Sequence, residues 1–347
     1  MSKIRNSSFL KLSNLRVVIR EILKHQPVSK AALAKKLQVG HSTVVQLLKP
    51  LIDRRIIVET ALGISTGGRP PILLRINPEA AYGLVVDLSG HNVKIALMNC
   101  ALQAVDTVSI ELTDDIYVDL ESIVQHSKVL MERVNGNRII GVCVAISGVM
   151  NPVTGKISSS LIKGLEAVRL GDYLTTRLEL PIFVENDANL SALGEFMKMD
   201  KETNNMFYIH MGEGLGGGFI IDRGIFRGDR GYAGEIGKIV YSVEPFRTVG
   251  DVYADMLRNQ NPTEDEIVKL LFTIVLNVAC TLDMVHFVVG GKKINITDRM
   301  LSDVESLVKE EFYGFDVEIR KSTDEPDSIL TGSMEYLIEN SLAHFHV

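Results

Sequence analysis

The glycine-rich segment at residues 207–238 is the sequence feature that most constrains this chain. Five of the seven residues from 212 to 218 are glycine, and an apolar run lies on each side. Glycines there allow a sharp turn or the close approach of the backbone to a ligand. Further on, Glu235 lies among small residues in GYAGEIGK, so its carboxylate has room to face a pocket. The segment predicts either the border of a ligand pocket or, with no functional role, a β-hairpin with bulges.

The length of 347 residues suggests two or three domains, and the composition is that of a foldable, soluble protein. Cys100, Cys143 and Cys280 lie far apart, which predicts neither a disulfide framework nor a CxxC zinc site and suits a reducing cytoplasm. The first residues contain no apolar signal core, so we expect a cytoplasmic protein. Residues 267–289 are very apolar, but Lys269, Asn277 and Asp283 interrupt them, which predicts a buried helix and a strand rather than a membrane span.

Charge is divided unevenly along the chain. Residues 1–80 hold 14 basic and 4 acidic side chains, a net charge of +10, whereas the remainder holds 23 and 39, a net charge of −16. A basic head on an acidic body indicates that the head meets a polyanion and the body does not. The alternative is a solvated basic surface without a partner.

The head is predicted to be a helix-turn-helix. Apolar residues at helical spacing predict helices at 12–25, 30–37 and from 42 onward, with Ser29 and Ser42 as N-caps and a tight turn at 38–40. Pro50 is expected to kink or end the third helix. Ser42, Thr43, Gln46 and Lys49 face outward and suit hydrogen bonds to phosphates and base edges.

Two strand-like runs, at 56–60 and 72–76, follow the third helix and predict a winged helix-turn-helix. The tip of this wing holds Gly67, Gly68 and Arg69, and an arginine on such a tip can enter a minor groove, where the potential is most negative. The alternative is a small winged module that contacts proteins.

The body, from about residue 79, predicts an α/β architecture because strand-like runs alternate with amphipathic helices. The predicted helices include 120–134, 188–199 and a long one that starts at a capping box, Thr263 to Glu266. The predicted strands are residues 84–90, 93–98, 139–146, 182–184, 206–210, 218–221 and 286–289.

The motifs resemble those of the ROK family, in the family's order and over almost the whole chain. The head, with SKAALAKKLQVGHSTVVQLLKPLIDRRIIVE and STGGRPPILLRINPEAAYGLVVDL, resembles the N-terminal part of ROK-family repressors. The body, with VENDAN, ALGE, the glycine-rich turn and GYAGEIGK, resembles the family's sugar-kinase-like domain. The resemblance implies a winged helix-turn-helix at 1–78 and, at 79–347, two actin-like, ribonuclease H-like α/β lobes with a sugar in their cleft.

The resemblance also implies the ligand-binding residues. Asp187 is at the position of the base that takes a proton from a sugar hydroxyl in family kinases, with Asn186 beside it, although an acid there can also serve as a helix N-cap. Glu235 is the expected pocket acid. Gly148 borders the cleft after a strand. Ser160 lies where the family has an asparagine that reaches the sugar, and this chain has none there.

Departures from the family's phosphate-binding turns predict that the chain is not an enzyme. After the first strand of the body, Ser89 replaces a glycine and the family's threonine is missing. In the second turn Glu213 replaces a threonine, and a carboxylate repels polyphosphate by about 1–4 kcal/mol at a few ångströms. Phosphoryl transfer depends on positioning and charge stabilisation, so we expect no useful kinase activity and no cofactor.

Lys238 stands where many family members have a zinc-binding histidine, and no cysteine follows it closely, so we expect no metal site. That histidine also contacts the sugar in the family. Lys238 would therefore place a cation beside the effector, which favours a sugar phosphate, or it pairs with Glu235 or another acid.

The leading hypothesis from the sequence is a cytoplasmic transcription repressor that binds palindromic double-stranded operator DNA as a homodimer or dimer of dimers. A sugar or sugar phosphate in the cleft would alter the spacing of the two heads. Two alternatives stay open: an active sugar kinase with a DNA-binding head, and a repressor controlled by a partner protein.

Overall fold

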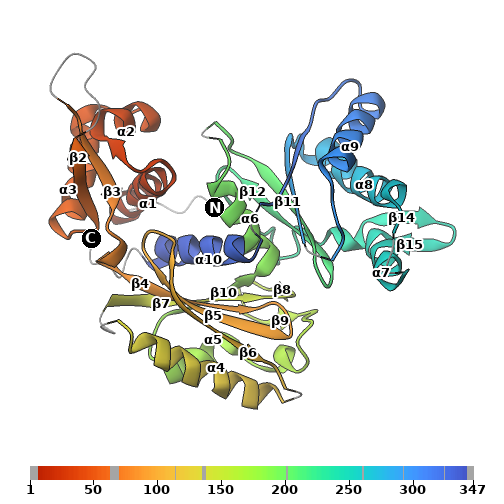
Figure 1. Cartoon of the computed structure of the whole chain (residues 1–347), viewed down its shortest axis with the longest axis horizontal. Coiled ribbons are helices and arrows are strands. Elements are labelled where there is room, and N and C mark those ends of the chain that lie inside the picture. Colours follow the sequence, from red (N-terminus) through yellow and green to blue (C-terminus); the bar gives the residue numbers. More distant parts are fainter. Residues whose placement is uncertain are drawn as a thin grey trace.

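The computed structural model of the chain describes residues 7–62, 70–113, 115–134, 138–200, 202–259, 262–291, 293–323 and 325–341. It consists of a small head followed by two lobes, each with its own five-stranded sheet (Figure 1). We call the lobe of the first large sheet lobe I and the lobe of the second large sheet lobe II. The winged helix-turn-helix head and the two-lobed α/β body predicted from the sequence are both confirmed.

The head contains three helices and a three-stranded antiparallel sheet of order β1-β3-β2. Its elements are α1 (Ser7–His25), β1 (Val28–Ser29), α2 (Lys30–Leu37), α3 (His41–Asp53), β2 (Ile57–Leu62) and β3 (Ile72–Ile76). Ser29 caps α2 as predicted, since its side chain accepts a hydrogen bond from the backbone N–H of Ala32.

The predicted N-cap of the third helix was wrong, and so was one of the two effects expected of Pro50. Gly40 is the N-cap of α3, with an extended backbone, and Ser42 lies inside the first turn instead. Pro50 does not end α3, which continues to Asp53. Because Pro50 lies in the last turn, the helix loses one backbone hydrogen bond there and has almost no helix left beyond it to distort.

The two large sheets share one topology. Each has three antiparallel strands followed by two that add in parallel, so both orders read third-second-first-fourth-fifth along the chain. Lobe I uses β4 (Tyr82–Leu88), β5 (Asn92–Asn99), β6 (Ala104–Glu111), β7 (Ile139–Ile146) and β10 (Ile182–Asn186). Lobe II uses β11 (Met206–Met211), β12 (Leu215–Ile221), β13 (Gly224–Phe226), β16 (His286–Gly290) and β17 (Glu318–Lys321).

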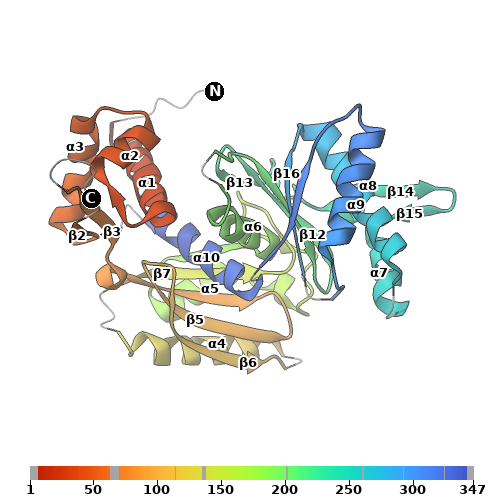
Figure 2. The same cartoon turned by 45° about the horizontal axis from the view of Figure 1, so that its top comes forward.

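Two helices lie between the sheets (Figures 1 and 2). α6 (Asp187–Met197) packs on β11 and β12 of lobe II, α10 (Glu325–Ser341) packs on β4 and β7 of lobe I, and the two helices pack on each other. Helices α4 (Ile116–Met131) and α5 (Leu170–Leu178) cover the far face of the lobe I sheet. Helices α7 (Val249–Asn259), α8 (Glu264–Leu282) and α9 (Asp298–Glu311) cover the far face of lobe II.

The first part of the glycine-rich segment forms the antiparallel hairpin of β11 and β12, which turns at residues 212–214. The apolar stretch at 267–289 forms most of α8 and then β16, as predicted. Within the described residues, none of the helices combines the length and apolarity that crossing a membrane requires. The capping box at Thr263 and Glu266 is also confirmed.

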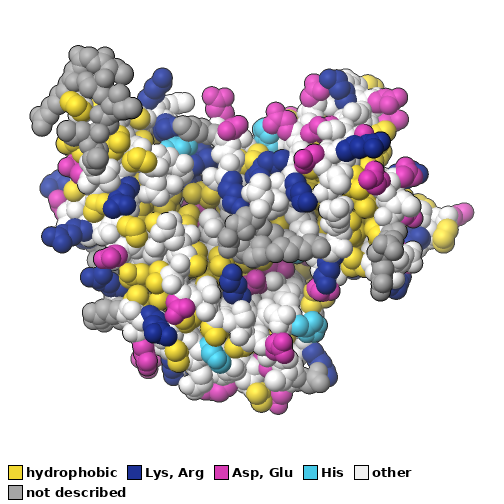
Figure 3. Space-filling view, viewed as in Figure 1, with side chains coloured by type: hydrophobic (Ala, Val, Ile, Leu, Met, Phe, Trp, Pro, Cys, Tyr) yellow, Lys and Arg dark blue, Asp and Glu magenta, His cyan; other side chains and the backbone are white. Residues whose placement is uncertain are grey.

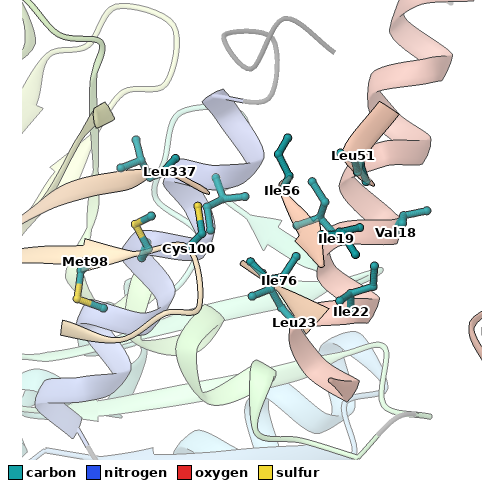
Figure 4. Close-up of a cluster of buried hydrophobic side chains, with 14 of the residues drawn as sticks. Val18, Ile19, Ile22, Leu23, Leu51, Ile56, Ile76, Met98, Cys100 and Leu337 are labelled. Atoms are coloured by element: carbon teal, nitrogen blue, oxygen red, sulfur yellow. The ribbon is translucent and has the colours of Figure 1, made fainter. Parts of the chain in front are cut away.

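The head and lobe I share one hydrophobic core. Apolar side chains of α1, α3 and β3 form a continuous buried cluster with side chains of β5 and α10 (Figure 4). Ile19 and Ile76 lie on the head's side of this cluster, and Met98, Cys100 and Leu337 lie on that of lobe I. The division of the chain at residues 78 and 79 stays a prediction.

Candidate ligand cavity between the lobes

A cavity of about 290 Å³ opens between the lobes where α6 begins. This volume is at the small end of the range for small-molecule sites, about 300–1,000 Å³. Its walls are the ends of β4 and β7, the first turn of α6, the β11–β12 turn and the loop after β13. The lining includes Ser89, Gly148, Ser159, Asn186, Asp187, Asn189, His210, Glu213 and Glu235.

Asn186 links the cavity wall to the start of α6. Its side-chain oxygen accepts a hydrogen bond from the backbone N–H of Asn189 at 3.0 Å, which makes Asn186 the N-cap of the helix. Its amide nitrogen donates to the carbonyl oxygen of Gly148 at 3.0 Å. Asn186, rather than Asp187, is therefore the cap, and the carboxylate of Asp187 is left to face the cavity.

Asp187 is a buried carboxyl group with a perturbed pKa. Burial raises the pKa to about 6, because the charged form loses hydration, and the negative charge of Asp87 acts in the same direction. The nearby His210 and a hydrogen bond from the N–H of Ala188 lower it. At neutral pH Asp187 is mainly ionised and accepts hydrogen bonds, as a sugar hydroxyl requires.

Glu235 contributes a second carboxylate, from the residue before the 3₁₀ turn Ile236–Lys238. Burial raises its pKa, and the charge of Lys238 lowers it. Lys238 itself is exposed and is not among the residues that line the cavity. The described lining therefore includes Asp187, Glu235 and Glu213 but no lysine or arginine.

Gly148 and Ser160 lie together, but only Gly148 lines the cavity. Gly148 has a φ of +128°, and a Cβ there would lie 3.0 Å from the backbone of Ser160. The Ser160 hydroxyl accepts a hydrogen bond from the N–H of Ile162, and its neighbour Ser159 reaches the cavity instead.

Sequence reasoning missed several lining residues, above all His210 and Asn189. His210 comes two residues before the glycine-rich turn, at the end of β11, and lies beside Asp187. Asn189 comes one turn after Asn186 on α6. Helical spacing from the cap would have indicated Asn189, whereas no local pattern points to His210.

In the two turns that depart from the family's phosphate-binding pattern, Ser89 and Glu213 each contact another side chain of this chain. The hydroxyl of Ser89 donates to Asp87 at 2.5 Å, and Glu213 forms an ion pair with Lys293 at 2.5 Å. Among the described residues, no group of three His, Cys, Asp or Glu side chains is placed to hold a metal ion.

Four of the residues predicted to meet DNA lie on the exposed face of one helix. Ser42, Thr43, Gln46 and Lys49 are all exposed on α3, and Lys49 forms an ion pair with Asp53. Gly67, Gly68 and Arg69 lie outside the described residues. Figure 3 shows Lys and Arg side chains along the outer edge of the head, whereas Asp and Glu are frequent over α8 and α9.

Comparison with known proteins agrees with the fold. Residues 83–250 match the profile of the ROK family. The xylose repressor of Bacillus spizizenii is 28% identical over 242 residues, which are 67% of this chain and 62% of the repressor. The chain spans about six tenths of the length of the curated relatives that it matches.

Solved structures share the architecture. A ROK family transcriptional regulator, described as a homolog of the E. coli MLC protein, superposes with a TM-score of 0.74 at 18% identity, over 97% of this chain and 98% of its own. The ROK hexokinase of Thermus thermophilus superposes with a TM-score of 0.61 at 16% identity, over 73% of this chain and 97% of its own. The fold is thus the mixed α/β fold with two actin-like lobes. The chain is a ROK family protein, related to the xylose repressors.

Proposed function

We propose that this protein is a cytoplasmic, sugar-responsive transcriptional repressor whose effector is a neutral monosaccharide, with D-xylose the first candidate. The observation that carries the proposal is the small cavity of carboxylate and amide groups at the start of α6, in a chain that begins with a winged helix-turn-helix head.

Charge supports a neutral effector. Asp187, Glu235 and Glu213 line the cavity, and the described lining has no lysine or arginine to bind a phosphate. Carboxylates and amides are suited to sugar hydroxyls, since a carboxylate accepts hydrogen bonds and an amide both donates and accepts. The small volume supports a single sugar ring, and the relative from Bacillus spizizenii is a xylose repressor.

The head supports a DNA partner. The exposed face of α3 carries Ser42, Thr43, Gln46 and Lys49, and in the sequence Gly67, Gly68 and Arg69 follow between β2 and β3. We propose that α3 reads the major groove and Arg69 the minor groove of a palindromic operator, bound by a homodimer.

Thermal unfolding with a panel of sugars tests the effector. The panel contains D-xylose, D-glucose, N-acetyl-D-glucosamine and the phosphates of each. We expect stabilisation by a neutral sugar, of about 2.7 kcal/mol at 100 times its dissociation constant, and none by its phosphate. Stabilisation by a phosphate alone would refute a neutral effector.

A sugar kinase is the second candidate, favoured by Asp187. A carboxyl with a pKa of about 6 inside a sugar-sized cavity suits a general base. Glu213 opposes this candidate, because by the family resemblance it replaces a threonine in the second phosphate turn of the kinases, where a carboxylate repels polyphosphate. Incubation with Mg-ATP and each sugar decides between them. We expect no sugar-dependent ADP release, and turnover at a rate typical of kinases, about 1–100 per second, would establish the kinase.

A further inference from the structure

Helix α1 belongs to the head and is also bound to both lobes. One face of α1 places Val18, Ile19 and Ile22 in the core that the head shares with lobe I (Figure 4). Its polar face carries Arg20, Glu21 and Lys24 toward the two lobes. Figures 1 and 2 show α1 beside the end of α10.

Arg20 ties α1 to lobe I. Its Nε donates to a carboxylate oxygen of Glu335 at 3.0 Å, and its guanidinium also pairs with Glu339, one turn further along α10. The Glu335 side chain is 1% exposed, so this is a buried ion pair. Separating the partners of a buried ion pair leaves a buried charge without compensation, which costs free energy. The pair therefore opposes movement of α1 away from α10.

The β12–β13 turn ties the same helix to lobe II. Arg223 in that turn places its Nη1 3.1 Å from a carboxylate oxygen of Glu21, and its backbone oxygen accepts a hydrogen bond from Arg20. Lys24 adds contacts to the end of α6, at 3.5 Å from the carbonyl oxygen of Phe196 and 3.2 Å from that of Asp200. Arg20 therefore bonds to both lobes through one guanidinium group.

The elements that hold α1 are also those that build the cavity. α6 begins at the cavity with Asp187 and ends near Lys24. It packs on α10 backbone to backbone, since a Cβ on Gly332 would lie 1.9 Å from the carbonyl oxygen of Leu190. The β12–β13 turn belongs to the strand whose other end, Leu215, lines the cavity. Close packing of this kind transmits displacement rather than absorbing it.

We propose that α1 is the element through which the state of the cleft reaches the DNA-binding head. Closure of the lobes on a sugar changes the position of the β12–β13 turn relative to α10. Because Arg20 and Glu21 hold α1 to both, α1 follows, and α3 turns with it. The regulatory consequence rests on the proposed function, whereas the mechanical link stands on the contacts of α1 alone.

Three variants of the described chain test the link. Arg223→Met removes the ion pair with Glu21, Arg223→Lys keeps the charge, and Arg258→Met is the matched control, an exposed arginine on α7 that pairs with Asp255. The readout is the ratio of the affinities for DNA without and with D-xylose, measured by fluorescence anisotropy on a duplex selected by the wild-type protein from a random library. Calorimetry of D-xylose binding shows that each variant is folded.

Wild type is expected to show a ratio in the usual range of allosteric coupling, about 5–150-fold. Arg223→Met should reduce the ratio to less than a third of the wild-type value with D-xylose affinity kept within about twofold. Arg223→Lys and Arg258→Met should keep the ratio. A wild-type ratio in Arg223→Met would overturn the inference.

A sugar-free measurement separates this inference from the proposed function. Spin labels on Cys280, exposed on α8, and on an Ala31→Cys substitution, exposed on α2, report the distance between lobe II and the head. Cys100 and Cys143 are buried, and burial raises the pKa of the Cys100 thiol to about 12, so neither competes for label. Arg223→Met should broaden the distance distribution and Arg223→Lys should not. If D-xylose does not alter DNA binding by wild type, the proposed function fails, and identical distributions for wild type and Arg223→Met refute the mechanical link.

Discussion

Replacing Asp187 with asparagine should make the protein more stable and, at the same time, a weaker sugar binder. Asparagine keeps the shape of the side chain and its oxygen can still accept the N–H of Ala188, so the substitution removes the charge and little else. The two effects have one cause, the burial that raises the pKa of Asp187 to about 6.

The size of the stability effect follows from the pKa. The shift from 3.8 to about 6 corresponds to about 3 kcal/mol, at 1.36 kcal/mol per unit. Because the folded-state pKa is raised, the folded protein is favoured when Asp187 is protonated, and this stability is lost as the pH rises from 3.8 through 6. Asp187→Asn should therefore be more stable than wild type by up to about 3 kcal/mol at pH 7.5 and equal to it below pH 4.

The affinity for sugar should rise with pH, whereas the stability contributed by Asp187 falls with pH. If only ionised Asp187 binds, the affinity of wild type falls about tenfold between pH 7.5 and pH 5, since about one molecule in eleven is ionised at the lower pH. Asp187→Asn should bind more weakly at pH 7.5 and lose this dependence on pH.

Urea unfolding at pH 4 and pH 7.5, with calorimetry of D-xylose at pH 5 and pH 7.5, measures both effects. Asp172→Asn on α5 is the matched control, since Asp172 is exposed and should change stability by less than about 0.5 kcal/mol. If Asp187→Asn is less stable than wild type at pH 7.5, the buried charge is not a cost, and the reasoning fails.

Three further substitutions test DNA binding by the head, the packing of α6 on α10, and the ion pair between Arg227 and Glu185. Lys49→Ala should weaken DNA binding and reduce, by about one, the slope of log affinity against log salt concentration. Because the Lys49 side chain is 73% exposed, the free energy of unfolding should stay within about 0.5 kcal/mol of wild type. An unchanged slope would exclude a contact between Lys49 and a DNA phosphate. Gly332→Ala should destabilise the protein by about 1–3 kcal/mol or more in urea unfolding, since its Cβ would lie 1.9 Å from a backbone oxygen of α6. The control Gly171→Ala should not destabilise it, because a Cβ there has no atom within 4 Å. Equal stabilities of the two variants would refute close packing of α6 and α10. Arg227, directly after β13 of lobe II, forms an ion pair with Glu185 of β10 in lobe I, and the Glu185 side chain is 3% exposed. Arg227→Met should lower the free energy of unfolding by about 3–5 kcal/mol, because it leaves the buried Glu185 without its ion-pair partner. A loss below about 1 kcal/mol would mean that the pair does not hold the lobes together.

Local structure was predictable where the sequence carries strong start and stop signals. α2 (Lys30–Leu37), β3 (Ile72–Ile76) and β7 (Ile139–Ile146) begin and end at the predicted residues. α2 has a serine cap and a turn directly after it, and β7 is an unbroken apolar run. At α3 the helix begins at His41, so Gly40, with an ordinary extended backbone and no side chain to bond the helix, takes the cap position in place of Ser42.

What the sequence could not provide are the contacts between distant segments. α10 escaped prediction because it is buried between the lobe I sheet and α6, which leaves little contrast between its faces. The pairing of Arg20 with Glu335 joins residues 315 positions apart, and no local pattern encodes it. In the cavity, Asp187 followed from the family resemblance and Glu235 from the small residues around it, whereas His210 and the surface position of Lys238 required the fold.

Reciprocal binding of sugar and DNA tests the central claim most directly. Calorimetry measures the affinity of the full chain for D-xylose, first alone and then saturated with the selected DNA duplex. Coupled sites must change each other's affinity by the same factor, so we expect the affinity for D-xylose to differ at least fivefold between the two titrations and to match the factor by which D-xylose changes DNA binding. Equal affinities for D-xylose with and without DNA would contradict the account.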